Sequence, residues 1–377
     1  MLYWLFYEKL FRLYTPFREF GYVTFRTASA SLTALFLCVA LGPWLIQKLR
    51  EFQIGQYIRE DGPKSHMKKA GTPTMGGILI IISVVVPTLL WANLRNPYVW
   101  IALFGMLSFG LIGFFDDYAK IRGKQNKGLT VREKFSFQVV AALVVGFILL
   151  SLHANKMYST SINMPFFKSF KPDLLIEPLV HNWYTYPLAF AGFYAFMVLV
   201  IVGASDSVNL TDGLDGLAIG LMIIASGAMT ILTYVSGNAK LAEYLDLARL
   251  PGAGELTIFC GSMVGASIGF LWYNAHPAEI FMGDVGSLAL GGALGVVAVL
   301  IKQEILLLFI GGVYVIEALS VILQVGSYKL RKKRIFKMAP IHHHFEALGW
   351  PESKIITRFW IAGLVMALFA LTTLKLR

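Results

Sequence analysis

The chain has 377 residues, of which 56% are hydrophobic and only 15% are charged. This composition excludes an ordinary soluble globular domain, in which about a quarter of the residues carry a charge. The 33 lysines and arginines outnumber the 22 acidic residues, a balance that favours contact with anionic lipid surfaces. The two cysteines, Cys38 and Cys260, lie inside apolar stretches, so we expect neither a disulfide framework nor a zinc site.

Apolar stretches of roughly 17 to 25 residues can cross a bilayer as helices, and the sequence contains about ten of them. The stretches are continuous rather than alternating, which favours helices over a barrel. Before the first stretch, the aromatic-rich segment 1–20 predicts an interfacial helix rather than a cleaved signal peptide. The expected spans, in chain order, are 23–47, 76–94, 98–115, 135–152, 186–204, 214–235, 256–273, 285–301, 305–327 and 356–374.

The positions of the basic residues predict how these spans are oriented. Most of the lysines and arginines lie in the five loops that follow the odd-numbered spans, and such loops are normally cytoplasmic. With an even number of spans, both termini then lie in the periplasm. We therefore expect an all-α polytopic membrane protein forming a single domain over 1–377. Its proline-containing loop at 153–185 is expected to be periplasmic and structured or strand-bearing, and its loop at 329–354 cytoplasmic.

Candidate functional residues occur in each of these five loops. Asp116 and Asp117 form an acidic doublet where the third span ends. Neighbouring residues on a helix point about 100° apart, so we expect the two carboxylates to have different roles. The alternative is a solvated helix end without catalytic function.

The segment that enters the sixth span carries Asn209, Asp212 and Asp215, which are spaced three residues apart. On a helix this spacing places the three side chains on one face, where they form a polar stripe. The alternative is that an aspartate here simply caps the next helix.

Asp284 stands between glycines at the start of the eighth span. Backbone amides at a helix start bind phosphate, and a carboxylate there can hold a metal ion; helix capping is again the alternative. Phe281 could stack on a nucleobase or pack internally. Asn274 lies at the other end of the loop that joins the seventh span to the eighth.

The last of the five loops contains His342, His343 and His344, close to a basic run at 331–334. Neutral imidazoles bind metals and protonated imidazoles bind phosphate groups. Because no cysteines lie nearby, a loop that holds pyrophosphate is a better interpretation than a zinc site.

Three further polar residues are candidates on weaker signals. Lys69 and Thr74 belong to a glycine-containing segment that loosely resembles a phosphate loop, although its lysine precedes the glycines. Gln324 is polar within an apolar span, where such residues serve either function or helix pairing.

Four of these motifs together resemble the phospho-N-acetylmuramoyl-pentapeptide-transferase family, within the polyprenyl-phosphate N-acetylhexosamine-1-phosphate transferases. The resemblance runs over essentially the whole chain, with the motifs in order and no departure at a motif position. The motifs are the Asp116-Asp117 doublet, NLTDGLDGL at 209–217, FMGDVGSLALGG at 281–292 and APIHHHFE at 339–346.

The resemblance implies an activity and its partners. Phospho-N-acetylmuramoyl-pentapeptide would move from its uridine diphosphate carrier to undecaprenyl phosphate, releasing UMP and forming lipid I for peptidoglycan synthesis. The reaction would take place at the cytoplasmic face of the bacterial inner membrane with Mg²⁺ as cofactor. A homodimer in contact with membrane lipids is expected, and no nucleic-acid partner.

The resemblance also implies roles for the candidate residues. Asp284 is the expected Mg²⁺ ligand. Asp117 is expected to deprotonate or position undecaprenyl phosphate, with Asp116 beside it, in a direct attack rather than through a covalent aspartyl intermediate. His342 and His343 would hold the pyrophosphate or the sugar–peptide portion. The remaining substrate-binding candidates, mostly on the nucleoside side, are Lys69, Thr74, Asn209, Asp212, Asp215, Asn274, Phe281, Gln324 and His344.

Two alternatives stay open at this stage. A sister transferase that uses another UDP-N-acetylhexosamine would share the aspartates but differ in the histidine loop. A secondary transporter would place its polar residues near the bilayer midplane, often in two related halves. Here the polar residues gather near span ends and no internal repeat is evident, which disfavours the transporter.

Overall fold

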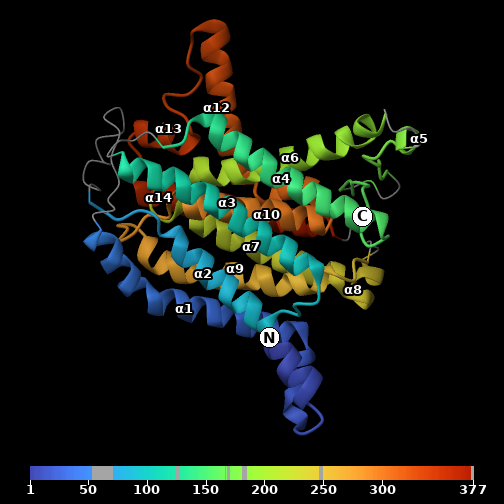
Figure 1. Ribbon diagram of the computed structural model, residues 1–377. Coiled ribbons are helices and arrows are strands. Elements are labelled where there is room, and N and C mark those ends of the chain that lie inside the picture. Colours follow the sequence, from blue (N-terminus) through green and yellow to red (C-terminus); the bar gives the residue numbers. More distant parts are fainter. Residues whose placement is uncertain are drawn as a thin grey trace.

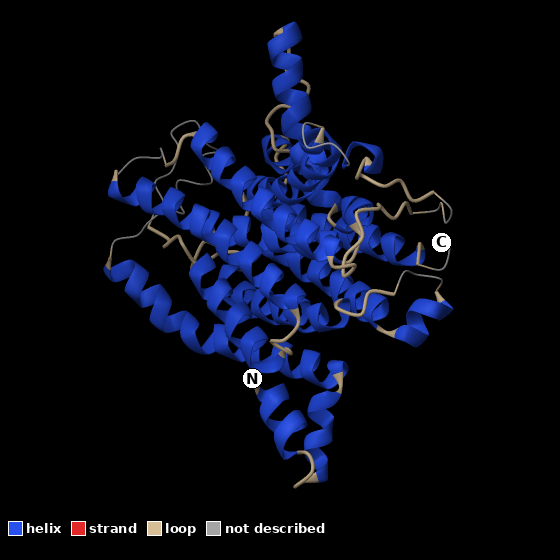
Figure 2. Ribbon diagram, turned by 45° about the vertical axis from the view of Figure 1, so that its right-hand side comes forward, coloured by secondary structure: helices blue, strands red, loops and turns tan. Residues whose placement is uncertain are grey.

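The computed structural model describes residues 1–52, 71–123, 128–165, 167, 170–180, 185–245 and 249–374. Within these residues the secondary structure is helical, and no strand is found (Figure 2); residues Ser161 and Asp173 form a single isolated bridge. The all-α prediction is therefore confirmed. The helices are η1 (Tyr3–Leu10), η2 (Thr15–Gly21), α1 (Val23–Glu51), α2 (Gly77–Trp91), α3 (Pro97–Arg122), α4 (Val131–Ala154), α5 (Glu177–Val180), α6 (Tyr186–Thr211), α7 (Leu217–Gly237), α8 (Ala239–Tyr244), α9 (Ala253–Asn274), α10 (Gly283–Leu300), α11 (Glu304–Ile310), α12 (Gly312–Arg331), α13 (Ile341–Ala347) and α14 (Glu352–Thr372).

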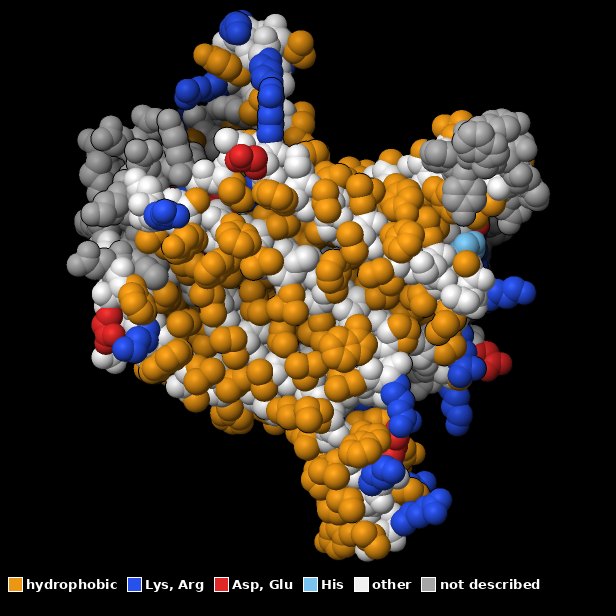
Figure 3. Space-filling model, in the orientation of Figure 1, with side chains coloured by type: hydrophobic (Ala, Val, Ile, Leu, Met, Phe, Trp, Pro, Cys, Tyr) orange, Lys and Arg blue, Asp and Glu red, His pale blue; other side chains and the backbone are white. Residues whose placement is uncertain are grey.

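The long helices lie side by side in one bundle (Figure 1). Nine helices of the described chain are long and apolar enough to cross a membrane, by length and composition, and α2 adds a shorter apolar helix of 15 residues. Apolar side chains cover the flank of the bundle, while lysines and arginines lie at its edges and on the protruding segments (Figure 3). The apolar side chains suit contact with lipid. The backbone can also lie in lipid, because each helix satisfies its own backbone hydrogen bonds.

The ninth expected span, 305–327, is two helices rather than one. Helix α11 ends at Ile310 and α12 begins at Gly312, with Gly311 between them. Two adjacent glycines have low helix propensity, which accounts for a break that the continuous hydropathy of this stretch conceals. The second half of α12 extends away from the bundle (Figure 1), and Leu330 near its end is 86% exposed.

Helix α10 lies at the centre of the bundle, where it packs against α3, α6 and α2. In its apolar window 89% of the residues are buried, compared with 28% for α1. At Gly113 of α3, the missing side chain lets the backbone of Asp284 approach closely. This contact brings the last two turns of α3 beside the first turn of α10, so residues far apart in sequence meet at one end of the bundle.

The N-terminal segment expected to be interfacial forms η1 and η2, which project from the bundle (Figure 1). It is fastened at its base by Arg26, whose guanidinium lies 4.4 Å from the ring centre of Tyr3. The same guanidinium makes two hydrogen bonds of 2.7 Å to Glu255. Contact of this segment with a membrane surface stays a prediction.

Candidate active site

Three carboxylates meet where α3 ends and α10 begins. Asp116 and Asp117 lie in the last two turns of α3, and Asp284 lies in the first turn of α10. One oxygen of each carboxylate lies within 4.8 Å of the other two. Asp116 and Asp117 are only 3% and 4% exposed, so the cluster is largely withdrawn from solvent.

Two lysines stabilise this cluster. The Lys120 ammonium lies 2.6 Å from Asp116, 3.2 Å from Asp117 and 3.1 Å from Asp284. The Lys134 ammonium, from the first turn of α4, lies 2.7 Å from Asp284. Buried carboxylates need such partners, because an unpaired buried charge is costly.

Hydrogen bonds from other parts of the chain orient the carboxylates. Asn209, near the end of α6, donates to Asp284 Oδ1 at 2.9 Å. The Val285 N–H donates to Asp117 at 3.3 Å, and the Leu129 N–H donates to Asp116 Oδ1 at 2.8 Å. The two members of the doublet therefore have different surroundings, and different roles for them stay a prediction.

The donor set fits a magnesium ion. Mg²⁺ prefers oxygen ligands and usually binds through one or two carboxylates together with substrate phosphates. The three carboxylates converge at one point, and two ammonium groups already lie at that point. The site is thus built to hold positive charge.

Thr74 lies beside the same cluster. Gly283, which opens α10 with φ of +70°, separates it from Asp117. A Cβ at Gly283 would lie 2.9 Å from Thr74 Oγ1 and 2.6 Å from Asp117 Oδ2. Both the backbone conformation and the close approach therefore require glycine at this position.

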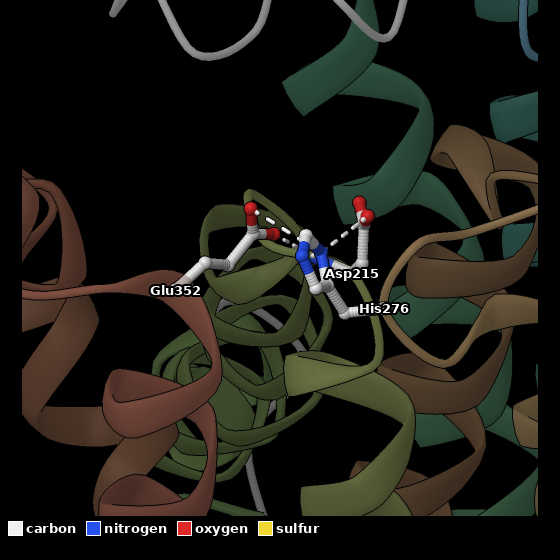
Figure 4. Close-up of side chains that lie close together, drawn as sticks. All are labelled: Asp215, His276 and Glu352. Atoms are coloured by element: carbon white, nitrogen blue, oxygen red, sulfur yellow. Dashed lines mark hydrogen bonds and ion pairs between the residues drawn. The ribbon is translucent and has the colours of Figure 1, made fainter.

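A second group of titratable side chains lies around Asp215 (Figure 4). His276 Nδ1 lies 3.2 Å from Asp215 Oδ2 and 3.5 Å from Glu352 Oε2. The Asp215 N–H donates to Glu352 Oε1 at 3.0 Å. The residues come from the turn between α6 and α7, the loop between α9 and α10, and the start of α14.

Asn274 and Phe281 lie at the two ends of that α9–α10 loop. Asn274 accepts the Gly216 N–H at 3.1 Å and donates to Ile280 O at 2.8 Å. The Phe281 N–H donates to Pro73 O at 2.8 Å, and its side chain is half-buried. The structure thus accounts for Asn274 as a support of the loop, and base stacking by Phe281 stays a prediction.

Asp212 caps the end of α6, outside the helices that are candidate spans. Burial raises the pKa of its carboxyl to about 8, and the negative charges of Asp284 and Asp117 contribute to this rise. The group is therefore largely protonated near neutral pH in the absence of ligands.

The three histidines have different environments. His342 is completely buried, with Nδ1 3.1 Å from Glu317 Oε2 and Nε2 against the backbone of Gly213. His343 Nδ1 lies 2.6 Å from Glu346 Oε2. The third histidine, His344, accepts the N–H of Lys337 at 3.1 Å through Nδ1. Contact of any of them with pyrophosphate stays a prediction.

Gln324 anchors the chain that follows α12. Its side-chain oxygen accepts the N–H groups of Ile335 and Phe336 at 2.9 Å, and its amide donates to Phe336 O. This is a structural role that neither alternative from the sequence foresaw. Lys69 lies outside the described residues.

The structure directly joins Asp116, Asp117, Asn209 and Asp284, and it adds residues that the sequence did not single out. Lys120 follows Asp116 by four residues, a spacing that pairs side chains on a helix, so local pattern alone could have found it. No local signal pointed to Lys134, His276 or Glu352 as members of these groups, nor to Ser287, whose hydroxyl accepts from the Asn209 amide at 2.8 Å.

Comparisons with known proteins identify the family. Residues 99–302 match the model described as glycosyl transferase family 4, and residues 69–81 match phospho-N-acetylmuramoyl-pentapeptide-transferase signature 1. Proteins named phospho-N-acetylmuramoyl-pentapeptide-transferase from Solibacter usitatus, Koribacter versatilis and Acidobacterium capsulatum are 69%, 65% and 65% identical to this chain. In all three comparisons 100% of both chains is covered. The family predicted from the motifs is therefore confirmed, and the chain belongs to the phospho-N-acetylmuramoyl-pentapeptide-transferases.

Proposed function

We propose that this protein transfers phospho-N-acetylmuramoyl-pentapeptide from its UDP carrier to undecaprenyl phosphate, releasing UMP and forming lipid I for peptidoglycan synthesis. Family membership over the whole chain supports the activity. The observation that carries the mechanism is the cluster of Asp116, Asp117 and Asp284, with Lys120 and Lys134 in contact with it.

The three carboxylates are proposed to have different roles. Asp284 would hold Mg²⁺, with Asp116 beside it in the cluster. A bound Mg²⁺ would supply charge neutralisation for the donor pyrophosphate and the leaving UMP. Asp117, which is oriented by the Val285 N–H, positions the acceptor phosphate or removes its proton. An oxygen of the acceptor phosphate then attacks the sugar-linked phosphorus of the donor directly, and the pyrophosphate bond to UMP breaks. Lys134 is placed to hold phosphate charge as the substrates enter the cluster.

The nucleoside side of the site is proposed to lie along the turn after α6 and the α9–α10 loop. Asp212, Asp215, Asn274 and Phe281 lie on or next to these two segments. Lys69, Thr74 and Asn209 are also proposed to bind the nucleoside side of the donor, from other parts of the chain. His342 and His343 are proposed to hold the pyrophosphate or sugar–peptide portion, with Gln324 and His344 as further substrate-binding residues.

We further propose one membrane domain over 1–377 in the bacterial inner membrane, with the active site facing the cytoplasm and both termini in the periplasm. The excess of lysines and arginines in the loops that follow the odd-numbered spans supports this orientation. A homodimer formed through exposed apolar helix faces is proposed, and 1–20 is proposed to lie at the membrane surface.

The test is UMP release by the purified full-length protein in detergent. UDP-N-acetylmuramoyl-pentapeptide, undecaprenyl phosphate and Mg²⁺ should give UMP and lipid I. Release with UDP-N-acetylglucosamine instead would move the assignment to the sister transferase. Release with neither donor, from protein shown to be folded, would refute the transferase proposal.

A further inference from the structure

The loop that joins α9 to α10 depends on contacts that the proposed reaction does not explain. It carries Phe281 and leads directly into Asp284. Its last residues are held by the start of α2 and by the chain before it, since the Gly77 N–H donates to Met282 O at 2.9 Å and the Phe281 N–H donates to Pro73 O at 2.8 Å. Its first half is held differently, by the Asp215 carboxylate, which accepts the Ala278 N–H at 3.1 Å.

Asp215 is in turn held by two side chains from elsewhere in the fold. Glu352 is the first residue of α14, and its Oε1 accepts the Asp215 N–H at 3.0 Å. The His276 imidazole lies between the carboxylates of Asp215 and Glu352, at 3.2 and 3.5 Å (Figure 4). Asp215 is only 4% exposed, so its carboxylate relies on such partners rather than on water.

We propose that Glu352 and His276 are positioning residues for the UDP-linked donor. They fix Asp215 and, through it, the 275–282 loop that presents Phe281 to the nucleoside. Neither residue is assigned a contact with the reacting atoms. This inference rests on the proposed function and deepens it, because it connects the last helix of the bundle to the donor side of the site.

These contacts predict which of the two substrates binds less tightly when Glu352 is replaced. Within the described chain, the hydrogen-bond donors to Asp116 and Asp117 come from α3, the start of α10 and the residues just before α4, and not from the 275–282 loop or α14. The end of the loop keeps its own backbone bonds to residues 73–77. Loss of Glu352 should therefore loosen donor binding, while the acceptor side and Asp284 keep their positions.

Steady-state kinetics of full-length variants test the inference. Glu352→Ala should raise KM for the UDP-linked donor about tenfold, a change of about 1.4 kcal/mol, and leave KM for undecaprenyl phosphate within about twofold. Glu352→Gln keeps a carbonyl oxygen for the Asp215 N–H and should recover most of the donor affinity. His276→Ala should act in the same direction as Glu352→Ala but less strongly. Ser353→Ala, at the exposed neighbouring position of α14, is the control and should match wild type.

Hydrogen exchange of 274–282 gives a second readout that needs no turnover. Exchange should be faster in Glu352→Ala than in Glu352→Gln or Ser353→Ala. Equal changes in both KM values, a loss of kcat alone, or a lower Tm with unchanged kinetics and exchange would overturn the positioning role. Absence of UMP release by wild type would instead overturn the proposed function, and the exchange experiment would still decide whether Glu352 holds the loop.

Discussion

Gly283 offers the sharpest test of how the acidic cluster is built. Its φ of +70° lies in the left-handed region, which costs an alanine about 1–2 kcal/mol. In addition, the new Cβ would lie 2.6 Å from Asp117 Oδ2, although real Cβ contacts essentially never fall below 3.0 Å. The Asp117 carboxylate must therefore retreat by roughly half an ångström. Because misplacement of a catalytic group by about 1 Å can cost a hundredfold in rate, we expect Gly283→Ala to lower kcat by about 10- to 100-fold.

Substitutions at two other glycines serve as controls that distinguish the effect of backbone strain from the effect of the clash with Asp117. Gly349 has φ of +86°, but a Cβ added there would have no atom within 4 Å, and Gly203 has neither positive φ nor a close neighbour. We expect Gly349→Ala to lower Tm by a few degrees with normal turnover. Gly203→Ala, inside α6, should be neutral or slightly stabilising.

The measurements are kcat from UMP release and Tm from thermal unfolding for all three variants. Normal turnover in Gly283→Ala would refute the argument that this glycine makes room for Asp117. So would an equal loss of turnover in Gly349→Ala, because strain alone would then account for the effect.

Four further outcomes are expected. Asp284→Asn should lose UMP release by about a hundredfold or more while staying folded by Tm and gel filtration; near-normal turnover would contradict its role as metal ligand. Removal of divalent ions with EDTA should stop turnover and added Mg²⁺ should restore it, and activity that survives chelation would argue against the metal. Asp212 has a pKa of about 8 in the fold against about 3.9 in an unfolded chain, so unfolding releases its proton and stability falls as pH rises between these values. In ligand-free protein, Asp212→Asn should therefore gain Tm relative to wild type from pH 5 to pH 8, and a gain that shrinks with rising pH would contradict the assignment. Arg26→Ala leaves Glu255 without its ion-pair partner and should destabilise the fold by about 3–5 kcal/mol, with normal kcat in the protein that remains folded.

The parts of the fold that the sequence predicted were those with a local signal. Long apolar runs indicated the helices, and the doublet at the end of α3 stood out because acids are rare in such a run. The break at Gly311 was missed because hydropathy is continuous across it. Helix α2 covers 77–91 of the expected span 76–94, and the chain turns to extended geometry at Ala92, just before the polar Asn93.

The parts of the site that the sequence did not predict depend on long-range contacts. Asp215 and Glu352 are 137 residues apart, and no spacing rule connects them. His342 was expected in a substrate-binding loop, yet its side chain is fully buried beside Glu317. That burial depends on the packing of α13 against α12 and α14 and on the missing side chain of Gly213, which leaves room for the imidazole.

Besides Lys120, backbone groups of neighbouring segments hold each of the carboxylates of Asp116 and Asp117. A Cβ at Gly128 would lie 2.5 Å from Asp116 Oδ1, just as one at Gly283 would meet Asp117 Oδ2. Each carboxylate is therefore packed against a backbone that lacks a side chain, and the same stretches of chain supply it with N–H donors from Leu129 and Val285. Backbone donors cannot change rotamer, so they fix the carboxylates at a smaller cost in side-chain entropy than further polar side chains would. Substitutions at these two glycines should consequently reduce turnover more than stability, whereas loss of a core contact elsewhere in the bundle should do the reverse.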